Sequence, residues 1–95
     1  MTYSVVKAQV HIRITGNVQG VFFRRSAKDE ADRLGICGWV RNDRDGSVEI
    51  VAVGPKEKLE KFTKWCKKGP PLARIEKVEV DWSNTEAEFN GFEII

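Results

Sequence analysis

The segment "GNVQGVFFRR", residues 16 to 25, joins a glycine-bracketed loop to the start of a predicted helix. Glycines at 16 and 20 let backbone N–H groups turn inward, and inward N–H groups at a helix N-terminus form an anion-binding nest. Cations are disfavoured by about 0.3–1 kcal/mol at this positive end of a helix, yet Arg24 and Arg25 both stand there. A tight strand-to-helix turn would use the glycines for shape alone, and spacing does not separate the two interpretations. The arginines favour an oxyanion, phosphate in particular, held between Arg24 and the loop, with Arg25 facing solvent or a neighbouring carboxylate.

Asn42, within "GWVRNDRDGSVE" at residues 38 to 49, is the second candidate for chemistry. Its amide offers both a donor and an acceptor, so it can hold a water molecule without taking its proton. Asparagine is also favoured in turns, and that structural role would explain it equally well. In a right-handed βαβ unit the first two strands run parallel. The end of the second strand then lies at the same edge as the loop after the first, where we expect Arg24 and Asn42 to meet.

Other patterns exclude competing chemistry. The glycine loop lacks a following Lys-Ser/Thr pair and lacks GxGxxG, so a magnesium-nucleotide pocket is not expected. Asp43 and Asp45 lack further metal ligands and are interpreted as turn formers. The lysines of the second predicted helix alternate with glutamates, which is typical of a solvated face rather than of nucleic-acid binding. His11 falls on a polar strand face and is assigned no catalytic role. We predict no metal and no cofactor.

The elements that must position Arg24 and Asn42 follow from periodicity. Apolar residues at every second position from Val6 to Ile14 predict a strand with one buried face. A helix follows and stops at Gly35. The segments "ICGWVRN" and "GSVEIVAV" then predict a hairpin. A second helix between Pro55 and Gly69, a strand at "IEKVEVDW" and a short strand at "FEII" complete the chain.

This order predicts a ferredoxin-like βαββαβ fold of the α+β class. We expect a two-layer sandwich, an antiparallel sheet with two helices on one face, and a single domain over residues 1–95.

Composition sets the class of protein. The 95 residues are 41% hydrophobic and 32% charged with a net charge of +2, too balanced to indicate nucleic acid or an anionic membrane. Cys37 and Cys66 provide neither metal spacing nor a disulfide framework, which fits a reducing compartment. We interpret them as two small buried hydrophobes, with one bridge between them left open. No apolar run approaches the roughly 20 residues of a membrane span, so we expect a soluble cytoplasmic protein, with a monomer as the default.

The two motifs together resemble the signatures of the acylphosphatase family. These read G-x-V-Q-G-V-x-F-R and G-[FYW]-[AV]-[KR]-N-x-x-x-G-x-V-E, and every fixed position is met in "GNVQGVFFR" and "GWVRNDRDGSVE". The later "GPPLARIEKVEV" is also similar to the family's segment before its fourth strand. The "FEII" ending differs from the Ile-Arg-Tyr-like tail of many members.

The resemblance implies hydrolysis of the carboxyl–phosphate bond of small-molecule acyl phosphates without a metal. It makes Arg24 the phosphate-binding residue and Asn42 the residue that orients the attacking water. The loop amides would form the phosphate cradle. The residues of that cradle are Asn17, Val18, Gln19, Gly20, Val21 and Phe22.

Such a sparse site is chemically adequate for this reaction. The leaving carboxylate is a weak base that departs without a general acid, and loose phosphoryl transfer needs the water placed more than deprotonated. A ferredoxin-like RNA-binding module would carry outward aromatics on its central strands, and "VEIVAV" has none. A non-catalytic domain that binds phosphate or another small anion is the remaining alternative, and it would not require Asn42.

Overall fold

The computed structural model describes residues 7–95, and within them the predicted order of elements is confirmed. Val6, at which the first strand was expected to begin, lies outside the described residues. The elements are β1 (Lys7–Asn17), α1 (Phe23–Leu34), β2 (Cys37–Asn42), β3 (Val48–Gly54), α2 (Lys56–Lys68), β4 (Arg74–Thr85) and β5 (Phe92–Ile94). Neither of these helices has the length and apolar character needed to cross a membrane.

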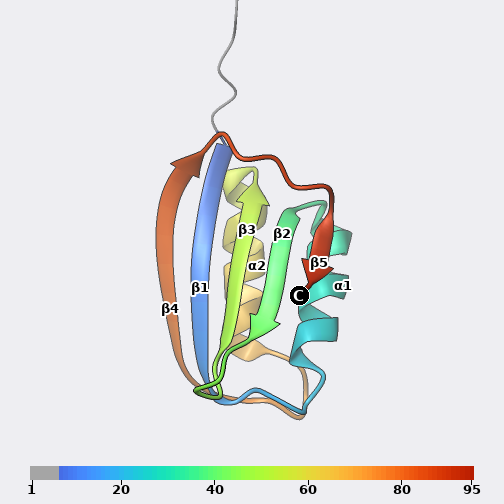
Figure 1. Cartoon of the computed structure of the whole chain (residues 1–95), viewed down its shortest axis with the longest axis vertical. Helices are drawn as coiled ribbons and strands as arrows, with labels where there is room; N and C mark the ends of the chain where they lie inside the picture. Colours follow the sequence, from blue (N-terminus) through green and yellow to red (C-terminus); the bar gives the residue numbers. More distant parts are fainter. Residues whose placement is uncertain (1–6) are drawn as a thin grey trace, which may run out of the picture.

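The strands form one sheet in the order β4-β1-β3-β2-β5, and both helices cover the same face of it (Figure 1). The four longer strands pair antiparallel, as predicted. The short β5 instead pairs parallel with β2, so the predicted antiparallel sheet is mixed at this one edge. The chain crosses from β4 over the end of the sheet before it enters β5, and it therefore arrives in the same direction as β2 (Figure 1).

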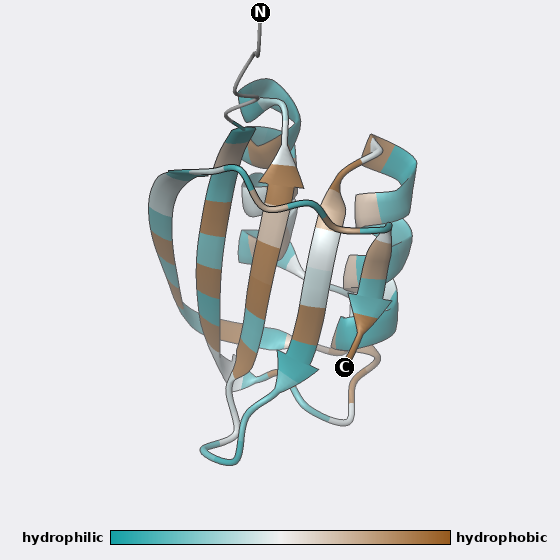
Figure 2. Ribbon diagram, turned by 45° about the horizontal axis from the view of Figure 1, so that its top comes forward, coloured by the Kyte–Doolittle hydropathy of each residue, from teal (hydrophilic) through white to brown (hydrophobic). Residues whose placement is uncertain are grey.

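The core lies between the sheet and the helices. Val10, Ile12 and Ile14 of β1 are fully buried, while the residues between them face the open side of the sheet, and the alternation is visible along the strand in Figure 2. Helix α1 contributes Phe23, Ala27, Ala31 and Leu34, and α2 contributes Leu59, Phe62 and Cys66. In each helix these residues recur three or four positions apart, so each helix packs one face against the sheet.

The two cysteines are both free. Cys66 is fully buried, and its burial raises the pKa of its thiol well above the usual range. Cys37 is only half-buried at the start of β2, so the expectation of two buried cysteines is wrong for that residue. A strand that begins beside a loop leaves its first side chain accessible from the open face.

Candidate active site

The loop between β1 and α1 combines two left-handed residues with an uncapped helix end. Gly20 has φ 74° and Phe22 has φ 65° and ψ 22°. Phe22 occupies the N-cap position of α1, where no side chain bonds the first amides, and the first turn contains no acidic residue. The first N–H groups of a helix have no intrahelical partner, so those of α1 are available to an anion.

Gly16 allows the loop to leave the sheet. The register between β1 and β4 shifts between Thr15 and Gly16, and Gly16 has φ 131°. A Cβ at this position would lie 2.1 Å from the carbonyl oxygen of Arg74. Glycine is therefore required at position 16 both by the close approach of the Arg74 backbone and by the positive φ angle. This position is where β1 turns toward the site.

Asn42 is the last residue of β2, directly before the hairpin turn. The loop after β1 and this hairpin lie at the same end of the sheet (Figure 1), as the handedness argument predicted. The Asn42 side-chain oxygen Oδ1 is buried and has no hydrogen-bond partner among residues 7–95. A buried acceptor without a donor costs about 1–3 kcal/mol, so Asn42 is poorly explained as a turn-former alone.

A hollow of about 330 Å³ joins these features. Arg24 and Asn42 both line it, as do three of the six predicted cradle residues, namely Val18, Gly20 and Phe22. Asn17, Gln19 and Val21 do not line the hollow. Phe23, Arg25 and Ile94 complete its lining, and Ile94 is a residue that the sequence did not indicate. The volume is at the lower end of the roughly 300–1,000 Å³ typical of small-molecule sites.

The two arginines differ in their partners. Arg25 Nε lies 3.4 Å from Asp29 Oδ1, which confirms the expectation of solvent or a neighbouring carboxylate. Arg24 is exposed, and its side chain makes no hydrogen bond or ion pair with any other residue of the described chain. Its positive charge at the hollow is thus uncompensated by the protein.

Gln19 has a structural role that sequence reasoning missed. Its side-chain Nε2 donates to the carbonyl oxygens of Asp43 (2.8 Å) and Ser47 (2.9 Å). The same two carbonyls accept the backbone bonds that close the hairpin turn, from Gly46 and Asp43 respectively. The two hydrogen bonds of Gln19 therefore link the loop to the hairpin that follows Asn42. No local pattern could reveal a contact between residues so far apart in sequence.

Asp43 and Asp45 bind arginine and serine, in agreement with their interpretation as turn formers. Asp45 Oδ1 accepts from the Ser47 hydroxyl (2.6 Å) and amide (2.9 Å), and its other oxygen pairs with Arg13. The Ser47 hydrogen bonds, more than the arginine, lower the pKa of Asp45 to about 2. Among the described residues, no three His, Cys, Asp or Glu side chains gather as metal ligands.

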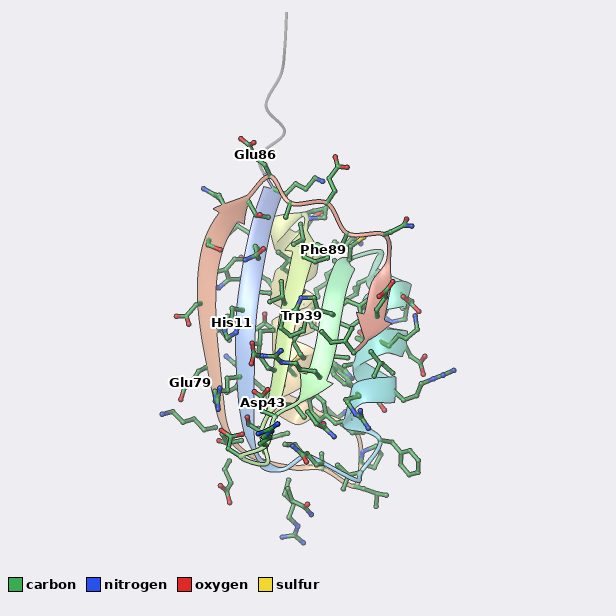
Figure 3. All side chains as sticks on the ribbon, in the orientation of Figure 1. His11, Trp39, Asp43, Glu79, Glu86 and Phe89 are labelled. Atoms are coloured by element: carbon green, nitrogen blue, oxygen red, sulfur yellow. The ribbon has the colours of Figure 1, made fainter. Side chains whose placement is uncertain are left out.

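A charged cluster on the open face of the sheet holds the end of β2. Arg41 contacts Asp43 Oδ1 through Nε (3.2 Å) and Glu49 Oε2 through Nη2 (3.1 Å), and it lies over the Trp39 ring. Glu49 also contacts His11 Nε2 at 3.0 Å, and the His11 hydrogen bond is the main cause of its lowered pKa. Figure 3 shows His11, Trp39 and Asp43 on this face. His11 thus serves a structural contact, consistent with its expected lack of a catalytic role.

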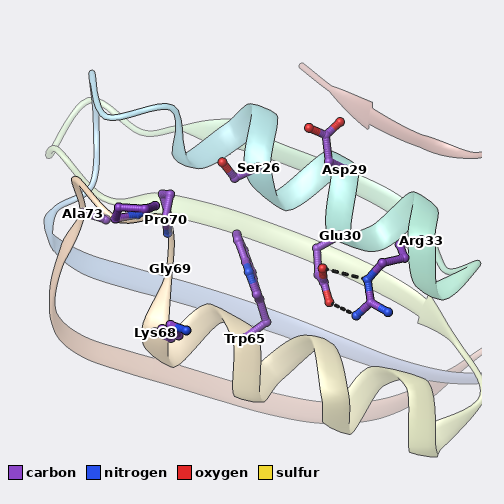
Figure 4. Close-up of a pocket in the computed structure, with 10 residues that line it drawn as sticks. Ser26, Asp29, Glu30, Arg33, Trp65, Lys68, Gly69, Pro70 and Ala73 are labelled. Carbon is purple, nitrogen blue, oxygen red and sulfur yellow. Dashed lines mark hydrogen bonds and ion pairs between the residues drawn. The ribbon is translucent and has the colours of Figure 1, made fainter.

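A larger hollow of about 730 Å³ lies between α1, α2 and the turn after α2 (Figure 4). Trp65 lies along it, and its charged residues include Glu30 and Arg33, which pair with each other. None of the predicted site residues lines it. The smaller hollow, which is lined by both Arg24 and Asn42, is therefore the better candidate for chemistry.

Comparison with known proteins identifies the family of the chain. A family model described as acylphosphatase matches residues 10–94. An acylphosphatase of Thiobacillus denitrificans is 54% identical over 84 residues, with 88% of this chain and 92% of the relative covered. One of Pelotomaculum thermopropionicum is 46% identical over 88 residues, covering 93% and 96%. The crystal structure of acylphosphatase from Bacillus subtilis superposes with a TM-score of 0.90 at 38% identity, covering 93% and 98%.

Proposed function

Because the chain belongs to the acylphosphatase family, we propose that the 330 Å³ hollow is where it hydrolyses acyl phosphates. Arg24 and the amides of the loop and first helical turn bind the phosphate, and Asn42 orients the attacking water. The products are a carboxylate and inorganic phosphate. The reaction needs no metal at this site.

The phosphate-binding half of the proposal rests on charge. The Arg24 side chain has no partner among residues 7–95, and α1 begins with free amides and no acidic residue in its first turn. A phosphate would satisfy both at once, since helix N-termini and guanidinium groups each bind oxyanions. Gly20 and Phe22, both left-handed, give the loop the alternation of backbone conformations typical of anion nests.

The observation that carries the catalytic half is Asn42, which lines the same hollow and whose buried Oδ1 has no hydrogen-bond partner among residues 7–95. A buried acceptor without a donor is suited to accept a hydrogen bond from a water molecule. The lone pairs of that water remain available to attack phosphorus. An asparagine amide has no proton to gain near neutral pH, so it positions water without competing as a base. Placement suffices because the carboxylate is a good leaving group and the transition state is loose.

The test is hydrolysis of benzoyl phosphate at neutral pH in the presence of a metal chelator, with wild type compared to Asn42→Ala. We expect turnover by wild type to persist with the chelator, and kcat of the variant to fall by about 10²–10³ with little change in KM. Asn84→Ala, an exposed asparagine on β4, is the matched control and should keep full activity. Circular dichroism establishes that all three proteins are folded.

Three outcomes would count against this proposal. Loss of wild-type turnover with the chelator would contradict the metal-independent reaction. A folded wild type that binds phosphate saturably but hydrolyses nothing would identify an anion-binding domain instead. Equal activity of Asn42→Ala and Asn84→Ala would remove Asn42 from the mechanism.

A further inference from the structure

Phe22 is an aromatic residue where neither the backbone nor the core requires one. Its left-handed conformation, φ 65° and ψ 22°, makes it the one described non-glycine residue of positive φ. Bulky side chains rarely adopt this region, whereas glycine and asparagine enter it easily. Its side chain is also 70% exposed, so burial does not repay the strain. Backbone strain of this kind gathers at functional sites.

Phe22 lines the hollow that also contains Arg24 and Asn42. Two other apolar side chains of the lining, Val18 and Phe23, are each only 1% exposed and already packed in the core. Ile94 is 39% exposed and comes from β5, at the opposite end of the sequence. The apolar surface that a ligand in the hollow could cover is therefore supplied mainly by Phe22 and Ile94.

We propose that Phe22 and Ile94 form the subsite for the acyl group and give the site a preference for aromatic acyl phosphates over acetyl phosphate. This inference rests on the function proposed above. In the reaction the water oxygen bonds to phosphorus while the bond from phosphorus to the acyl oxygen breaks. The electron pair leaves with the carboxylate, and the water protons end on the phosphate. The acyl group stays attached until that step, so apolar contacts to it are present in the transition state.

The charges around the hollow favour an apolar acyl group over an anionic one. Arg24 is assigned to the phosphate, and the guanidinium of Arg25 is already paired with Asp29. The hollow contains no other cationic side chain among its lining residues. A second carboxylate or phosphate on the acyl group would lack a dedicated partner, whereas an aromatic ring can pack against Phe22 in an offset or edge-to-face arrangement.

The experiment compares kcat/KM for benzoyl phosphate and acetyl phosphate and follows their ratio. Phe22→Asn retains the left-handed conformation and removes the ring, and we expect the ratio to fall by about 3- to 10-fold. Phe22→Trp keeps an aromatic surface and should preserve the ratio. Ile94→Asn should lower the ratio in the same direction. Leu72→Asn removes a side chain that is 63% exposed but outside the hollow, and its ratio should equal that of wild type.

The outcomes separate this inference from the function beneath it. Failure of wild type to hydrolyse either substrate would overturn the proposed function and with it the subsite. Hydrolysis of both substrates with an unchanged ratio in Phe22→Asn would overturn the subsite alone. Thermal unfolding of Phe22→Asn at or above the wild-type temperature is expected, since the strain is relieved. If Phe22→Asn is unfolded at the assay temperature, the ratio is measured in Ile94→Asn instead. An unchanged ratio in that variant overturns the subsite.

Discussion

The side-chain amide of Gln19 donates to the carbonyl oxygen of Ser47 at 2.9 Å, across 28 positions of sequence. A second bond from the same nitrogen reaches Asp43. The loop that is proposed to bind phosphate and the hairpin that carries Asn42 are thus joined by one side chain. A displacement on the order of 1 Å at a reacting centre can cost about 10² in rate, so this connection bears on catalysis as well as on stability.

Replacing Gln19 with alanine removes both bonds. Each carbonyl keeps one backbone donor, so the expected loss in free energy of unfolding is about 1–3 kcal/mol, the worth of two hydrogen bonds. We expect kcat to fall by roughly 10- to 100-fold because loop and hairpin lose their alignment. Urea unfolding and steady-state kinetics measure the two effects. Gln9→Ala, which loses only an exposed contact to Ser83, is the control. Normal kcat in a destabilised Gln19→Ala would restrict the role of Gln19 to the fold.

Arg24→Ala should lower activity without lowering stability. The variant removes an unpaired cation from the positive end of α1, so stability should stay level or rise by about 0.3–1 kcal/mol. Loss of the charge that clamps the transferring phosphate should lower kcat/KM by about 10³–10⁵. Arg25→Ala loses only an exposed pair with Asp29 and should lose less than about 10-fold. Thermal unfolding and benzoyl phosphate kinetics provide the data. Comparable losses of activity in both variants would contradict the assignment of Arg24.

Two glycines of the loop should differ in their tolerance of alanine. Nothing lies within 4 Å of a Cβ built on Gly20, so Gly20→Ala costs only the left-handed backbone, about 1–2 kcal/mol. A Cβ on Gly16 would collide with the backbone of Arg74 at 2.1 Å, and Gly16→Ala should cost about 3 kcal/mol or more. Urea unfolding of both variants distinguishes strain from collision. Equal losses would mean that the register shift in β1 can relax around a side chain.

The Asp45 carboxylate should stabilise the hairpin in a pH-dependent way. Its pKa falls from 3.8 to about 2 on folding, chiefly through the Ser47 hydrogen bonds. A depressed pKa in the folded state contributes stability above the unfolded pKa, and this contribution disappears as pH falls through the folded value. The difference in unfolding free energy between wild type and Asp45→Asn should therefore be constant from pH 7 to about 5 and shrink progressively toward pH 2. A difference that is the same at pH 7 and pH 2 would exclude ionisation as its cause.

Periodicity predicted the parts of the fold that depend on local pattern. The alternation through Val10, Ile12 and Ile14 marks the buried face of β1, and the spacing of Phe23, Ala27 and Ala31 marks the packed face of α1. The parallel pairing of β5 could not be predicted in this way. A three-residue strand has too few side chains to specify a neighbour or a direction, and both are set by where the preceding loop crosses the sheet.

The same distinction between local pattern and contacts of distant segments applies to the candidate site. The chain handedness brings Arg24 and Asn42 to one end of the sheet, and their residue types are the basis of the roles proposed for them. Side-chain contacts between distant segments carry no local signal, so the Gln19 bonds and the presence of Ile94 in the hollow were not predicted. The left-handed Phe22 was missed for the opposite reason, because the propensity of phenylalanine argues against the conformation that it adopts.

The order in which the strands are synthesised determines when the candidate site is complete. Asn17 and Asn42 are made early, yet β1 acquires its second neighbour only with β4, and Ile94 joins the hollow only with β5. At about 5–20 residues per second, the stretch from Asn42 to Ile94 takes roughly 3–10 s to translate. During that interval a nascent chain would contain Arg24, Asn42 and the loop between β1 and α1, but not the strands β4 and β5 that complete the sheet. Hydrolytic activity on the ribosome would therefore report the arrival of the last strand and not the presence of the proposed catalytic side chains.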